Sequence, residues 1–182
     1  MNKFLVLVLS LIAVLPISAQ VSHKDTWMES GHQILSVGYS PNGDFVYTLG
    51  KDNRIIVRET VTGSIHRTIT AGPEQANAAV FSSDGRFLIS GGADHAVTVW
   101  NFAMGEVFRQ LEGHEDAVSS LSVSNDPAII ASGSEDRTVR IWDISMGETL
   151  HVLEGLPDKV TSINFHPDED LIIGGSADGT VA

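Results

Sequence analysis

The chain has 182 residues, with 23 acidic against 11 basic side chains and a formal net charge of −12 at pH 7. Such an acidic protein repels phosphate backbones and anionic membrane surfaces, so nucleic acid is not an expected partner. Because the chain has no cysteine, disulfide bonds cannot stabilise it, and the hydrophobic core must do so alone.

The first 19 residues have the pattern of a secretory signal peptide. One positive charge, Lys3, precedes an apolar run over 4–17, and small residues end the segment at Ala19. The alternative is a membrane anchor, but the run is shorter than the roughly 20 residues of a spanning helix. We therefore expect residues 1–19 to be removed. The mature protein would then be secreted or periplasmic, without membrane attachment after cleavage.

A repeat of 42 residues runs through the rest of the chain. The aspartates and glycines that keep this spacing are Asp52, Asp94, Asp136 and Asp178, and Gly63, Gly105 and Gly147. The turn segments "SPNGD" (40–44), "SSDGR" (82–86), "SNDPA" (124–128) and "HPDED" (166–170) keep it as well. No insertion breaks the register, so each copy is expected to form the same structural unit.

Each copy contains four short segments rich in valine, isoleucine and leucine, separated by turn residues. In the third copy these segments are 117–124, 128–134, 138–144 and 149–154. Short apolar bursts and alternation between turns are typical of half-buried strands. Four strands in about 42 residues predict an all-β fold, a β-propeller of four-stranded antiparallel blades.

The third copy, "GHEDAVSSLSVSNDPAIIASGSEDRTVRIWD" (113–143), resembles a WD repeat. It has a Gly-His pair at the start, an aspartate in the turn before the third strand, and Trp142-Asp143 at the end. The other copies keep parts of this pattern. The resemblance implies blades over 31–71, 72–112, 113–154 and 155–182, the last of them incomplete.

A serine, a histidine and an aspartate in this copy raise the alternative of a catalytic set. Ser132, His114 and Asp136 have partial counterparts at the repeat spacing, whereas a catalytic centre is expected once, and no G-x-S-x-G segment is present. The WD-repeat resemblance implies a structural role instead. In that family these three residues and Trp142 form a hydrogen-bonded chain inside one blade. We expect no enzymatic activity.

No cofactor or metal is predicted. The acidic segment at 166–170 occupies the turn position of every other copy and lacks the spacing of a calcium loop. The seven histidines are scattered and have no cysteine beside them, so zinc is not indicated.

The predicted function is a non-catalytic scaffold for protein–protein interaction outside the cytoplasm. The WD-repeat resemblance implies that a protein partner docks where first strands begin and third strands are about to begin. The positions that we select on this face are Gln33, Lys51, Gln75, Asn77, Glu135 and Lys159. The alternative is a binding module of a larger secreted enzyme with its catalytic domain beyond Ala182.

About three and a half blades are expected, which leaves the propeller ring incomplete. Residues 20–30 precede the first blade, and "DTWMES" (25–30) lies in the position of an outermost strand. It resembles the N-terminal strand that closes the last blade in complete propellers, with Trp27 facing a blade that these residues do not supply. Because exposed sheet edges invite aggregation, we expect the sequence to be the N-terminal part of a longer protein.

Overall fold

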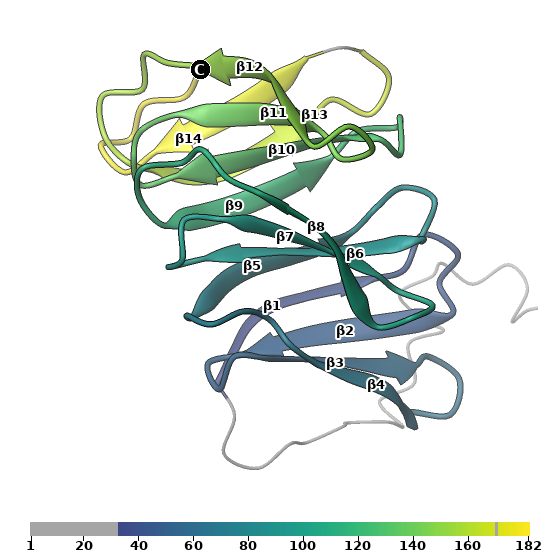
Figure 1. Ribbon diagram of the computed structural model, residues 1–182. Helices are drawn as coiled ribbons and strands as arrows, with labels where there is room; N and C mark the ends of the chain where they lie inside the picture. Colours follow the sequence, from purple (N-terminus) through teal and green to yellow (C-terminus); the bar gives the residue numbers. More distant parts are fainter. Residues whose placement is uncertain (1–32, 170) are drawn as a thin grey trace, which may run out of the picture. The chain divides into compact units, whose positions relative to one another are not determined.

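The computed structural model describes residues 33–169 and 171–182, and over these residues the chain is all β. Fourteen strands form four antiparallel sheets that follow one another along the chain (Figure 1). Strands that are neighbours in sequence are also neighbours in their sheet. The prediction of propeller blades, three with four strands and one partial, is confirmed.

The first three sheets have four strands each and the last has two. The first sheet contains β1 (Ile34–Tyr39), β2 (Phe45–Gly50), β3 (Arg54–Glu59) and β4 (Ile65–Thr70). The second contains β5 (Ala76–Phe81), β6 (Phe87–Gly92), β7 (Val97–Asn101) and β8 (Glu106–Leu111). The third contains β9 (Val118–Val123), β10 (Ile129–Ser134), β11 (Val139–Asp143) and β12 (Glu148–Leu153). The fourth pairs β13 (Val160–Phe165) with β14 (Ile172–Ser176).

Left-handed backbone closes the turns between strands. Gly43 and Gly85 have φ angles of 76° and 73° in the turns after β1 and β5, as the Asn-Gly and Asp-Gly pairs predict. In the turn between the second and third strands, Asn53, His95 and Arg137 have φ angles of 61°, 62° and 69°. Asparagine adopts this conformation readily, but the sequence does not signal it at His95 or Arg137, because other L-residues adopt it infrequently.

The hydrophobic core lies between successive sheets. One cluster joins residues of the first and second sheets, including Tyr47, Leu49, Ala76 and Phe81. Two further clusters join the second sheet to the third and the third to the fourth. Each sheet therefore depends on its neighbours to cover its apolar face, as repeat architectures require.

Glycines in the second strands let the next sheet approach closely. A Cβ atom on Gly91 would lie 2.7 Å from a γ-methyl of Val118, and one on Gly133 would lie 2.6 Å from a γ-methyl of Val160. These distances are shorter than non-bonded carbon atoms tolerate, so both positions need a residue without a side chain.

Polar side chains also join successive sheets. The Asn77 amide donates to the Val118 carbonyl at 3.0 Å, and the Ser119 hydroxyl donates to the Val160 carbonyl at 2.5 Å. At the outer strands, the Arg109 guanidinium donates to the Ser145 carbonyl of the next sheet at 3.0 Å. The sheets are thus held by hydrogen bonds at their inner and outer strands in addition to the apolar clusters.

Two predicted features, the signal peptide over 1–19 and the segment 20–30 with Trp27, lie outside the described residues. Within 33–169 and 171–182, no helix has the length and apolar character needed to cross a bilayer.

Candidate partner-binding face and buried hydrogen-bond chain

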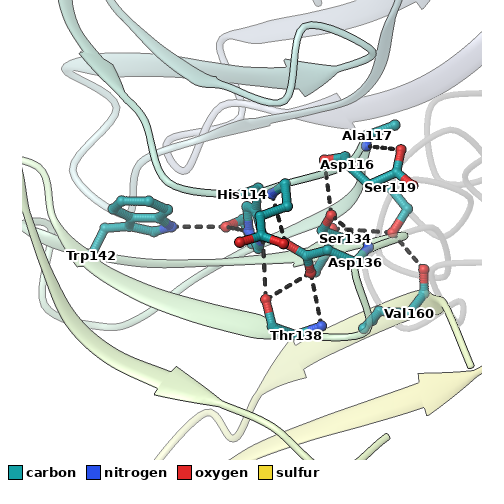
Figure 2. Close-up of polar contacts among 12 residues, drawn as sticks. His114, Asp116, Ala117, Ser119, Ser134, Asp136, Thr138, Trp142 and Val160 are labelled. Atoms are coloured by element: carbon teal, nitrogen blue, oxygen red, sulfur yellow. Dashed lines mark hydrogen bonds and ion pairs between the residues drawn. The ribbon is translucent and has the colours of Figure 1, made fainter. Parts of the chain in front are cut away.

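The four residues predicted to form a hydrogen-bonded chain come together in the third sheet (Figure 2). Trp142 on β11 donates its indole N–H to the Ser132 hydroxyl on β10 at 2.8 Å. The Nε2 atom of His114 lies 2.7 Å from the same hydroxyl, and Nδ1 lies 2.7 Å from Oδ2 of Asp136. One proton arrangement satisfies every contact: serine donates to Nε2, and Nδ1–H donates to the aspartate.

Burial keeps the histidine of this chain neutral. Desolvation lowers the pKa of His114 below 6.5 and outweighs the hydrogen bond and the charge of Asp136, which act to raise it. The contact between His114 and Asp136 is therefore a hydrogen bond from a neutral imidazole to the carboxylate at pH 7. Partial burial acts to raise the pKa of Asp136. Hydrogen bonds from Thr138, His114 and the Glu115 amide outweigh it and lower this pKa to about 2.

These shifts predict a loss of stability in acid. The folded pKa values of His114 and Asp136 lie below 6.5 and 3.8, so the unfolded chain binds more protons. The His114 contribution is complete above pH 6.5 and is lost as the pH falls through its folded pKa. The Asp136 contribution, at most about 2 kcal/mol, is lost between pH 3.8 and about 2. Urea unfolding across this pH range measures both.

The variant Thr138→Val separates the aspartate from the histidine. It removes the 2.7 Å hydrogen bond from the Thr138 hydroxyl to Asp136, so the pKa of Asp136 should rise toward 3.8. The lower acid step should then shrink while the step below pH 6.5 remains. Superimposable pH profiles for Thr138→Val and the wild type would contradict this assignment.

The second sheet has a shorter version of the chain. The Trp100 indole donates to the Ser90 hydroxyl at 3.0 Å, and that hydroxyl donates to the Ala71 carbonyl at 3.1 Å. A backbone carbonyl thus replaces the histidine that this copy lacks. The sequence gives no signal of a backbone acceptor. The sequence does signal the role of Thr138, because Thr180 likewise follows its turn aspartate by two residues. In the structure the Thr180 hydroxyl also donates to Asp178, at 3.0 Å.

The serine of the third sheet is not arranged as a nucleophile. The Ser132 side chain is fully buried, and its oxygen already accepts the indole N–H of Trp142. His114 is buried beside it, so no substrate atom can approach the hydroxyl without opening the sheet. A nucleophile instead needs access and a facing oxyanion site.

The predicted partner-binding positions lie at one end of the strands in each sheet. Backbone amides of the turn before the third strand donate to carbonyls at the start of the first strand. In the first sheet Lys51 donates to Gln33 at 2.8 Å, and in the fourth Ala177 donates to Lys159 at 2.9 Å. The second and third sheets repeat this contact between Ala93 and Gln75 and between Glu135 and Ala117. We name this end of the sheets the candidate face; its residues are Gln33, Lys51, Gln75, Asn77, Glu135 and Lys159.

Side chains of the candidate face differ in their contacts. Glu135 and Lys159 are exposed and form an ion pair between the third and fourth sheets, with Nζ 3.5 Å from Oε2. Gln75 donates to the Ala76 carbonyl at 2.7 Å. Asn77 is partly buried and uses its amide nitrogen to hold the second sheet to the third. The exposed charges are thus better placed to contact a partner than Asn77.

Nothing in the described part of the chain assembles a metal site, since no three His, Asp or Glu side chains converge there. The acidic turn near the end of the chain is organised by its histidine. The Nδ1 atom of His166 accepts hydrogen bonds from the Asp168 amide at 3.2 Å and from the Glu169 amide at 3.0 Å. The His166 ring therefore caps the turn.

Four-stranded sheets stacked in chain order, with a histidine–serine–tryptophan chain inside one of them, define a β-propeller protein built from repeats. The WD domain, G-beta repeat model matches residues 24–58, 63–101, 105–143 and 147–182. The chain belongs to the WD-repeat family.

Solved structures agree with this assignment, while no curated protein sequence matches the chain. The structure of U3-55K has 23% sequence identity and a TM-score of 0.79, and the match covers 85% of this chain and 49% of that one. The crystal structure of the RRP9 WD40 repeats has 24% identity and a TM-score of 0.79, covering 85% and 48%. The chain spans about half the length of either structure, and at these identities the likeness shows the fold alone.

Proposed function

We propose that this WD-repeat chain is a non-catalytic scaffold that binds a protein partner outside the cytoplasm through its candidate face. The observation that carries the proposal is the repeated placement of polar side chains at the same end of the strands in every sheet, exposed in the first, third and fourth sheets and partly exposed in the second. The Glu135–Lys159 ion pair gives the candidate face charges of both signs. Charged side chains of this kind set partner choice and association rate more than they set affinity.

The remaining parts of the proposal have separate support. The buried Ser132–His114 pair favours a structural role over catalysis, because its hydrogen bonds are already satisfied within the blade. The signal-peptide pattern at 1–19 supports export. If the exported chain is recovered, its first residue should be Gln20. Recovery of an uncleaved N-terminus from the cytoplasm would contradict the location.

Site-specific photo-crosslinking tests the binding face. A photoreactive residue in place of Glu135 or Lys159 should give an adduct with a second, reproducible protein when the full chain is expressed in its native host. Met146 offers a matched control. It is exposed, and it lies in the turn after β11, at the opposite end of the strands of the third sheet. Equal adducts from the candidate face and from Met146, or adducts only with another copy of this chain, would contradict the proposal.

A further inference from the structure

One position in the turn after the second strand has left-handed backbone in all four sheets. Its residues are Asn53, His95, Arg137 and Gly179, with φ angles of 61°, 62°, 69° and 91°. In this conformation the β-carbon of an L-residue crowds the following carbonyl oxygen, and glycine avoids the crowding because it has no β-carbon. The turn therefore fixes the backbone at this position, and glycine adopts that backbone with the least strain.

The side chain of Asn53 has a structural role. Its amide nitrogen donates to the Gly72 carbonyl at 2.9 Å and to the Glu74 carbonyl at 2.7 Å. Its amide oxygen accepts a hydrogen bond from the Ala76 backbone N–H at 3.0 Å. These bonds join the turn of the first sheet to the segment that leads into the second sheet. Asparagine is also one of the L-residues that adopt left-handed backbone most readily.

The side chains of His95 and Arg137 have no such role. Both are exposed, and within the described residues neither side chain forms a hydrogen bond, an ion pair or a ring contact. The sequence has 23 acidic residues, yet Arg137 pairs with none of those that the structure describes. The second sheet, which carries His95, has a complete four-stranded sheet on either side, so no missing neighbour explains the exposure. The fold accounts for the backbone at these two positions but not for a histidine or an arginine.

Both residues lie beside the candidate face. Arg137 follows Glu135 by two residues in the same turn, and His95 follows Ala93, whose amide donates to the Gln75 carbonyl at 2.8 Å. Strained backbone tends to occur where a side chain serves function and not the fold. We propose that Arg137 and His95 are contact residues of this face that donate hydrogen bonds to carboxylate groups of the protein partner. The inference rests on the proposed function and specifies the chemistry of the partner.

The chemistry of the two side chains selects a carboxylate. The planar guanidinium of arginine carries donors in a fork that matches both oxygens of a carboxylate, and histidine donates through a ring N–H. Because Arg137 has no partner among the described residues, it breaks no internal ion pair when it binds. Lys159, which also lies on the candidate face, already contacts Glu135. Arg137 is therefore the cation of this face that is available to an acidic partner.

Urea unfolding of glycine variants tests whether the two side chains serve the fold. Arg137→Gly or His95→Gly should lower the unfolding equilibrium constant about two- to five-fold, because relief of the left-handed strain exceeds the added freedom of glycine in the unfolded chain. The matched control is Asn53→Gly at the same turn position, which should raise that constant because it removes three hydrogen bonds. A chain that is less stable with glycine at position 95 or 137 would overturn the inference.

Photo-crosslinking from position 159 measures binding in the same variants. Arg137→Gly should lower the yield of the adduct with the second protein about tenfold, as expected for a lost hydrogen bond between charged groups, and His95→Gly should lower it as well. Arg86→Ala is the control, because Arg86 is an exposed arginine in the turn after β5, at the opposite end of the strands. An unchanged yield for Arg137→Gly would overturn the inference alone, whereas no adduct from the wild-type chain would contradict the proposed function as well.

Carbodiimide coupling identifies the group that the partner supplies. Arg137→Lys introduces a primary amine, and a water-soluble carbodiimide joins an amine to a carboxylate in contact with it through an amide bond, releasing the corresponding urea. This variant should give more covalent product with the second protein than the wild-type chain does, and Arg86→Lys should give no increase. No increase for Arg137→Lys would overturn the assignment of a carboxylate.

Discussion

Replacing Ser132 with alanine is expected to lower the free energy of unfolding by about 3 kcal/mol. The substitution leaves the Trp142 indole N–H and the His114 Nε2 atom without their partner inside a closed sheet. Each buried polar group left unsatisfied costs roughly 1–3 kcal/mol. Urea unfolding monitored by tryptophan fluorescence measures the loss.

The matched variant is Ser90→Ala in the second sheet, which is expected to cost about half as much. It leaves one donor, the Trp100 indole, without its acceptor, and the Ala71 carbonyl loses a hydrogen bond. Carbonyl oxygens tolerate a missing partner better than N–H groups do. Equal losses for the two variants would show that the histidine adds nothing to the chain. Ser162→Ala, at an exposed position on β13, controls for loss of a hydroxyl.

Replacing Gly91 with leucine is expected to destabilise the protein by roughly 1–3 kcal/mol or more, because it overpacks the second interface. The first atom of the new side chain would already lie 2.7 Å from a Val118 methyl group. The first interface shows how a leucine can be accommodated at this position. There the position of Gly91 is taken by Leu49, and the position of Val118 is taken by Ala76, with both residues buried in one cluster.

The double variant Gly91→Leu with Val118→Ala reproduces that first interface and should be more stable than the sum of the single losses predicts. Val118→Ala alone should cost about 1–3 kcal/mol through the cavity that it leaves. A double-mutant cycle by chemical unfolding gives the coupling, expected at about 0.5–3 kcal/mol in favour of the pair. Additive losses would mean that the two positions do not share one packing space.

The sequence predicts the sheets well because the 42-residue register repeats both the turns and the apolar bursts. It also predicts the partners of the His114 chain, since all four residue types are present at their WD-repeat positions. The Gly91 and Gly133 contacts follow from the same register. Whether Glu135, Lys159 and the rest of the candidate face bind a protein stays a prediction.

Other features depend on backbone or on neighbouring sheets, and the sequence does not indicate them. The Ala71 carbonyl that serves Ser90 has no side-chain signature. His95 and Arg137 adopt left-handed backbone where glycine is the usual choice. The bond from Asn77 to the next sheet appears only when two copies of the repeat are placed side by side. A single repeat, read alone, contains no information about these contacts.

The pairing of large with small residues across the sheet interfaces bears on how the gene can change. Tandem DNA repeats are prone to unequal recombination, which deletes or duplicates whole units. Here a deletion of the second repeat would place Leu49 against Val118, two large side chains in a space that elsewhere holds one. A duplication of that repeat would instead place Gly91 against Ala76 and leave a void. The third repeat is different, because Gly91–Val118 and Gly133–Val160 are the same pairing, so its loss or duplication would leave this packing unchanged. The large-to-small pairing therefore disfavours loss or duplication of the second repeat and not of the third.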